Sequence, residues 1–203
     1  MVDPGEEIEA VQIEVRPAKK RIAYFKIRYI CNYNNPGLRF MPAIHYNKQL
    51  LIAGIIFTLH NTEEAFGFRQ FRFDENPLMH IPRNGEMTTA IVIITLLAWI
   101  AIGWIALQPQ IKPKRFLLTT LVSVFLFNAF IPHILGAIYV GGYFPALVTA
   151  VILYLPYTYW MLPRLYNEFG DRRSFYITVG QGICIAIALT GFSQLAGYLI
   201  YRL

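Results

Sequence analysis

The sequence contains apolar runs that are long enough to cross a lipid bilayer. The run from Thr88 to Leu107 has no charged residue. Four further apolar runs lie near residues 48–68, 116–140, 143–162 and 175–200. Lipid offers no hydrogen-bond partner to an open strand, and the runs are too continuous for the alternating strands of a membrane barrel. We therefore predict an all-α integral membrane bundle of about five transmembrane helices, each of about 20 residues.

The composition supports this class of protein. Charged residues make up 15% of the chain and hydrophobic residues 56%, whereas soluble domains have about 25% charged residues. The net charge of +6 raises nucleic-acid binding as an alternative. The basic residues lie between the apolar runs, however, where contact with lipid headgroups explains them better. We expect membrane lipid and no nucleic acid as a partner.

The distribution of Lys and Arg predicts the orientation. Of the 18 basic residues, 14 lie before the first run or in the segments 108–115 and 163–174. The other side of the membrane has Arg69, Arg72, Arg83 and Arg202. Because basic residues concentrate in cytoplasmic segments, the N-terminus is expected in the cytoplasm. The predicted location is the inner (plasma) membrane, crossed several times.

The N-terminal segment differs from the rest of the chain. Residues 1–14 are acidic, residues 16–39 are basic and rich in turn formers, and no apolar stretch of a signal peptide follows. We expect residues 1–41 to be a disordered cytoplasmic tail and residues 42–203 to be the transmembrane domain. The alternative is that translation starts at Met41 and that the upstream residues are a start-site artefact.

A polar group interrupts the first apolar run. His60, Glu63 and Glu64 are spaced i, i+3 and i+4, so they lie roughly on one face of a helix. Each ionisable group in a bilayer costs on the order of 2.5–3.5 kcal/mol on insertion scales. A cation would relieve both the repulsion between the carboxylates and their burial. A histidine with a carboxylate one turn later is half of a site for zinc, iron or manganese.

The third run supplies a second histidine at a similar depth. His133 is 17 residues beyond Phe116 and Glu64 is 14 beyond Leu50, which corresponds to about 25 and 21 Å of helical rise. Pro132 cannot donate to the carbonyl of Asn128, so a kink is expected there. Asn128 and His133 are five residues apart and need that kink to face one site.

Other interpretations of these residues remain. His133 alone fits a hydrogen bond between helices. Glu63 and Glu64 fit the outer membrane interface, or ion pairs with Arg69 or Arg72. Gln194, near the outer end of the last run, is a further candidate for the polar cluster.

These residues resemble the HXXEE-motif membrane protein family, a group of small bacterial multi-pass proteins. The resemblance rests on His60-Asn-Thr-Glu63-Glu64, on the later His133 and on an element similar to Tyr-x-Pro-Gly. That element reads Tyr143-Phe-Pro-Ala146 in this chain, so alanine replaces the glycine of the family motif. The resemblance covers roughly residues 45–200. It implies which residues matter and gives no reaction.

Three functional hypotheses follow. The first is a metal-dependent membrane enzyme that acts on a lipid-soluble substrate, with His60, Glu64 and His133 as metal ligands. In it, Glu63 is the base or a fourth ligand, and Tyr143 orients a ligand or water. The second is a proton-coupled carrier, against which the lack of an internal repeat counts. The third is a non-catalytic membrane protein held together by a structural polar cluster.

Overall fold

The computed structural model describes residues 44–70 and 84–202. The predicted tail, with the alternative start at Met41, lies outside the described residues, as do Arg72 and Arg83. Those expectations stay predictions. The described part of the chain is helical and has no strand, which confirms the predicted helical bundle.

Five helical rods make up this part of the chain. Two of them are composite, because a short π-helical segment (η) joins α-helices without a break. The elements in chain order are α1 (Tyr46–Gln70), α2 (Asn84–Ala106), α3 (Ile111–Asn128), η1 (Ala129–Ile134), α4 (Leu135–Val140), α5 (Leu147–Thr149), η2 (Ala150–Tyr154), α6 (Leu155–Glu168) and α7 (Arg172–Arg202). The third rod consists of α3, η1 and α4, and the fourth rod consists of α5, η2 and α6.

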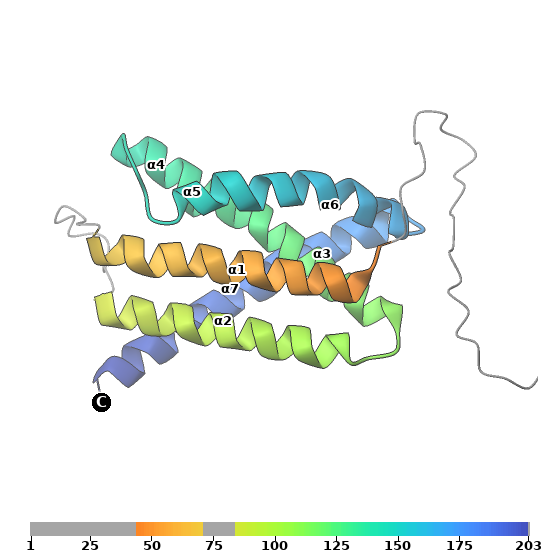
Figure 1. The fold of residues 1–203 in the computed structure, drawn as a ribbon, viewed down its shortest axis with the longest axis horizontal. Helices are drawn as coiled ribbons and strands as arrows, with labels where there is room; N and C mark the ends of the chain where they lie inside the picture. The colour runs from red at the N-terminus through yellow and green to blue at the C-terminus, as the bar shows by residue number, and fades with distance from the viewer. Residues whose placement is uncertain (1–43, 71–83, 203) are drawn as a thin grey trace, which may run out of the picture. The chain divides into compact units, whose positions relative to one another are not determined.

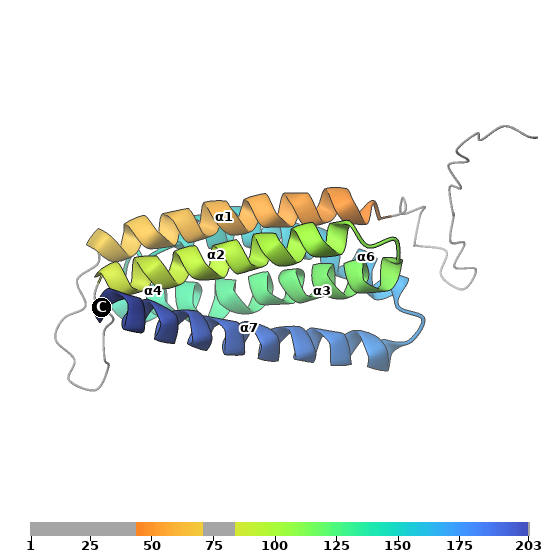
Figure 2. The same ribbon diagram turned by 90° about the horizontal axis from the view of Figure 1, so that it is seen from below.

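Successive rods run in opposite directions (Figures 1 and 2). The α1 helix packs against α2 and α3, while α7 packs against α2 and α3, and α6 against α3. Hydrogen bonds join α1 to α2: Asn61 Nδ2 donates to Thr95 Oγ1 over 2.7 Å, and Trp99 Nε1 donates to Thr58 Oγ1 over 2.8 Å. This arrangement brings the end of α1 that carries His60 beside the end of the α3 rod that carries His133.

Three described helices are long and apolar enough to cross a membrane: Gly85–Ala106, Ile111–Val140 and Arg172–Tyr201. They correspond to the predicted runs near 88–107, 116–140 and 175–200. The runs near 48–68 and 143–162 also form helices but are not in this group. Membrane insertion of all five stays a prediction.

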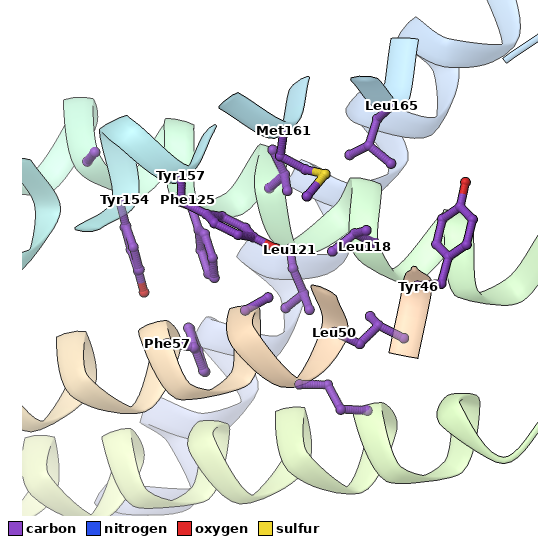
Figure 3. Close-up of a cluster of buried hydrophobic side chains, with 14 of the residues drawn as sticks. Tyr46, Leu50, Phe57, Leu118, Leu121, Phe125, Tyr154, Tyr157, Met161 and Leu165 are labelled. Atoms are coloured by element: carbon purple, nitrogen blue, oxygen red, sulfur yellow. The ribbon is translucent and has the colours of Figure 1, made fainter. Parts of the chain in front are cut away.

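The apolar core lies between α1, α3 and α6. Figure 3 shows Leu50, Leu118, Phe125, Met161 and Leu165 converging from these three helices, and all five are fully buried. The outside of the bundle is also apolar: large exposed side chains such as Leu96, Ile100 and Trp104 cover it. A soluble monomer rarely exposes apolar patches beyond a few hundred Å², so this surface is suited to lipid.

Candidate functional site

His60 and His133 form the centre of a buried polar cluster. His60 comes from α1 and His133 from η1, and neither side chain has exposed surface. Their Nε2 atoms lie 3.1 Å apart, and the two rings meet edge to face with centroids separated by 4.7 Å. The two histidines that the sequence named as candidate ligands are therefore in direct contact.

The Nδ1 atom of each histidine ring contacts the segment at the start of the fourth rod. His133 Nδ1 lies 2.6 Å from the carbonyl oxygen of Pro145, which only accepts, so Nδ1 carries the proton. His60 Nδ1 lies 3.0 Å from Thr149 Oγ1, and that hydroxyl donates to the carbonyl of Ala146 over 3.3 Å. The hydroxyl is thus left as an acceptor for a proton on His60 Nδ1. Both Nε2 atoms then carry lone pairs.

Asn128 supplies the donor that these lone pairs share. Its Nδ2 lies 3.0 Å from His60 Nε2 and 3.2 Å from His133 Nε2. The opposite tautomer of His60 would set an N–H of that ring against the amide N–H, which supports the assignment given above. The side chain of Asn128 therefore fills the place where a cation would meet both rings.

The η1 segment explains how Asn128 and His133 reach the same point. Its hydrogen bonds run from residue i to residue i+5, as when Leu135 N–H donates to the carbonyl of Phe130. Residues five apart therefore lie closer to one face of the rod than in a regular α-helix, where they are about 140° apart. Pro132 lies inside this segment, so the expected distortion takes the form of a π-helical turn. Such turns often occur at functional sites.

An aromatic stack covers one side of the cluster. Tyr154, from η2, stacks on His60 with ring centroids 4.0 Å apart and on Phe125 with centroids 4.1 Å apart. Figure 3 shows the rings of Tyr154 and Phe125 side by side above α1. The Tyr154 hydroxyl is buried and has no hydrogen-bond partner among the described residues. The stack fixes the plane of the His60 ring and keeps water from this face.

Glu63 anchors the start of the fourth rod. One carboxylate oxygen, Oε1, accepts from Tyr143 Oη over 2.8 Å and from Val148 N over 3.2 Å. The other, Oε2, accepts from Thr149 N over 2.8 Å. A carboxylate at free amide groups of a helix N-terminus satisfies donors that have no partner within the helix. Glu63 thus holds the segment that carries Pro145 and Thr149 against the histidines.

Tyr143 lies in the loop before α5 and is half exposed. Partial burial, followed by the hydrogen bond to the Glu63 carboxylate, raises the pKa of Tyr143 from 10.0 to about 12. The hydroxyl therefore stays protonated and donates to Glu63. The two residues predicted to be catalytic, Glu63 on α1 and Tyr143 in the loop, are therefore hydrogen-bonded to each other.

The loop owes its path to one left-handed residue and two close contacts. Ala146 has φ +60°, the one positive value at a non-glycine residue in the described segments. This is the position at which alanine replaces the glycine of the Tyr-x-Pro-Gly element. A Cβ on Gly67 would come within 2.9 Å of Pro145 Cβ, and one on Gly136 within 2.9 Å of Phe144 Cδ2. The turn is therefore formed despite the alanine, and two glycines make room for it.

Glu64 faces another part of the bundle. Its half-buried side chain lines a cavity between α1, α2, α3 and α7, together with Asn61, Asn128 and Gln194. Neither histidine lines that cavity. In residues 44–70 and 84–202, no group of three or more His, Cys, Asp or Glu side chains is arranged to hold a metal ion. The predicted ligand set of His60, Glu64 and His133 is therefore not assembled as a unit.

The comparison with protein families decides the affiliation of the chain. A family model described as "Protein of unknown function with HXXEE motif" matches residues 51–161. The chain belongs to the HXXEE-motif family. The HXXEE residues are His60, Glu63 and Glu64, and the matched region also includes His133 and Thr149. The family description assigns no reaction.

One relative of this HXXEE protein is the "Uncharacterized protein YrkK" of Bacillus subtilis (strain 168), which is 24% identical over 99 residues. The match covers 49% of this chain and 63% of the relative, so the chain spans less than two thirds of that protein. No solved structure matches the chain.

The sequence pointed to some members of the HXXEE site and missed others. It named His60 and His133, and it made the participation of Asn128 depend on a kink. Thr149 and the carbonyl of Pro145 were missed, although both lie in or beside the element that carried the family resemblance. Tyr154 was missed because an aromatic residue in an apolar run carries no signal of its own.

Proposed function

We propose that this HXXEE protein is an integral membrane protein that binds one divalent metal ion between His60 and His133. Membrane insertion is supported by the three long apolar helices and by the apolar exterior of the bundle. The N-terminal side of α1 faces the cytoplasm in this proposal, since most Lys and Arg residues lie on that side.

Cysteine labelling tests the orientation. Gly142 and Gly170 lie in loops at opposite ends of the rods, and a Cβ on either would meet nothing within 4 Å. In a background without Cys31 and Cys184, we expect a membrane-impermeant maleimide added to intact cells to label Gly142→Cys but not Gly170→Cys. Disruption of the cells should make Gly170→Cys reactive. The reverse pattern, or recovery of the protein in the soluble fraction, would refute the proposal.

The convergence of two Nε2 lone pairs carries the metal proposal. Two imidazoles on one tetrahedral zinc ion, with bonds of about 2.0–2.1 Å, place their nitrogens about 3.4 Å apart. His60 Nε2 and His133 Nε2 are 3.1 Å apart, so a small shift of either ring admits the ion. Metal-binding histidines usually donate their other ring N–H to a fixed acceptor. Thr149 Oγ1 and Pro145 O are such acceptors.

The same geometry suggests what completes the site. Rotation of the Asn128 amide would replace its NH2 group with Oδ1, a neutral oxygen ligand. Positions left open to water or substrate are typical of catalytic rather than structural zinc sites. This favours a metal-dependent membrane enzyme. A lipid-soluble substrate fits this proposal because the helices around the histidines carry apolar side chains on the surface of the bundle.

The second candidate is a proton-coupled carrier. A separation of 3.1 Å between two nitrogens is also that of a hydrogen bond, so one proton can be shared by His60 and His133. In this alternative the pair binds and releases a proton and no metal. The third candidate is a purely structural cluster, which binds neither a metal ion nor a proton.

Metal analysis of the purified protein separates the candidates. We expect about one equivalent of a transition metal after gentle detergent extraction and addition of Zn²⁺, Fe²⁺ or Mn²⁺ in separate experiments. His60→Gln and His133→Gln should each lose it. His45→Gln is the matched control, because His45 is exposed at the other end of α1. Equal metal content in all four proteins, or none in the wild type, would contradict the proposal.

A further inference from the structure

The cavity beside Glu64 is a second polar feature, and the histidine site does not use it. It has a volume of about 100 Å³ and lies between α1, α2, α3 and α7. Its polar lining consists of Asn61, Glu64, Asn128, Thr190, Ser193 and Gln194. The other lining residues are apolar, and they include Phe57, Ile91 and Val124. Thr190 and Gln194 are exposed, so the cavity opens at the surface of the bundle along α7.

The hydrogen-bonding capacity left in this cavity is mainly that of acceptors. Asn61 uses its amide nitrogen on Thr95, and Asn128 uses its amide nitrogen on the histidine pair. The carbonyl oxygens of both amides remain available as acceptors. The Ser193 hydroxyl donates to the carbonyl of Thr190 and keeps its lone pairs. Among the described residues, the Glu64 carboxylate makes no hydrogen bond or ion pair.

A carboxylate in a partly apolar cavity calls for a cationic partner. A buried charge without a partner is far more costly than a paired one. Oxygen atoms on one side and apolar side chains on the other suit an alkylammonium ion. Hard inorganic cations need a shell of six or more oxygens, which a half-apolar wall does not offer.

We propose that this cavity binds the protonated amine of a small alkylamine or of an amphiphile, with Glu64 as its counter-ion. An apolar cavity of about 150 Å³ holds a benzene molecule. A cavity of about 100 Å³ therefore takes an ammonium group and a few carbons, and a longer chain would leave through the opening beside α7. The inference does not depend on a metal at His60 and His133. The two sites share only Asn128.

Calorimetric titration of the detergent-solubilised full chain tests the proposal, with n-butylammonium chloride as the probe. We expect saturable binding of n-butylammonium, no binding of the neutral analogue 1-butanol, and no competition by sodium chloride beyond its effect on ionic strength. Glu64→Gln should weaken the binding roughly tenfold to a hundredfold, which corresponds to the loss of a charge-assisted hydrogen bond.

Two further variants keep the result interpretable. Glu63→Gln is the matched control, because Glu63 is the adjacent carboxylate and faces the 143–149 segment; it should bind butylammonium as the wild type does. Ala186→Leu, which fills the cavity from α7, should abolish binding. The proposal is overturned if no heat of binding appears up to about 20 mM ligand, or if 1-butanol binds as well. It is equally overturned if Glu64→Gln binds with wild-type affinity.

Discussion

His60 Nε2 lies 3.1 Å from His133 Nε2, although 73 positions separate the two residues in the chain. The three residues of the HXXEE motif lie in three different surroundings. His60 joins the buried pair, Glu63 holds the start of the fourth rod, and Glu64 lines a separate cavity. The motif is therefore not one set of ligands in this protein.

Removal of the Glu63 carboxylate should loosen the 143–149 segment. Glu63→Ala takes away the acceptor for Tyr143, Val148 and Thr149, and we expect a loss of about 1.5–3 kcal/mol of stability. Tyr143→Phe removes one neutral donor and should cost about 0.5–1.5 kcal/mol. The measurement is the apparent melting temperature in detergent for both single variants and the double variant. If Glu63→Ala melts like the wild type but loses metal, Glu63 is a ligand or base and not an anchor.

The left-handed backbone at Ala146 predicts which substitutions position 146 tolerates. Ala146→Gly removes the strain at φ +60° and also a buried methyl group, so its stability should stay within about 1 kcal/mol of the wild type. Ala146→Val adds a β-branched side chain to a buried left-handed position and should cost at least about 2 kcal/mol. Thermal melting compares the three proteins. Equal stability of the valine variant would mean that residue 146 has another conformation.

The contact between Gly67 and Pro145 predicts that alanine is tolerated less well at Gly67 than at Gly191. Gly67→Ala would bring a Cβ within 3.0 Å of the Pro145 backbone, so a loss of about 1–3 kcal/mol is expected. Gly191→Ala is the control, because a Cβ there meets nothing within 4 Å. Alanine in that helix should be neutral or stabilising. If the two variants melt at the same temperature, the fourth rod does not pack against α1 as described.

The start of α7 predicts a dependence of stability on pH. Asp171 accepts hydrogen bonds from the Ser174 hydroxyl, from Ser174 N over 3.0 Å and from Arg173 N over 2.7 Å. The bond from the Ser174 hydroxyl, followed by those from the backbone amides, lowers the pKa of Asp171 below its usual 3.8.

Because the folded protein holds Asp171 in its charged form, the stabilisation is complete above the pKa of the unfolded chain. It is lost as the pH falls through the lower pKa of the folded protein. Asp171→Ala should therefore lower the melting temperature by a few degrees at neutral pH, and the difference should vanish in acid. A difference that stays constant down to about pH 2 would contradict this role.

The sequence was informative where regular geometry decides the outcome. Helical rise placed Glu64 and His133 at a similar depth, and the residue that meets His133 is His60, about one turn before Glu64. The five helical rods follow from the length and polarity of the apolar runs. Pro132 indicated a distorted helix between Asn128 and His133, and η1 is that distortion.

The different surroundings of Glu63 and Glu64 could not be predicted from the sequence. Adjacent residues on a helix point about 100° apart, and which carboxylate meets which neighbour depends on how the fourth rod packs against α1. That packing rests on Gly67 beside Pro145 and on the left-handed Ala146. Neither contact leaves a periodic pattern in the chain.

X-ray absorption at the zinc edge tests the central claim most directly. For the Zn²⁺-loaded wild-type protein, we expect scattering from two imidazole rings with nitrogen atoms at about 2.0–2.1 Å. One ring should disappear in His133→Gln, and the His45→Gln spectrum should match the wild type. A spectrum without imidazole scattering, or one that His133→Gln leaves unchanged, would show that His60 and His133 do not hold a metal ion between them.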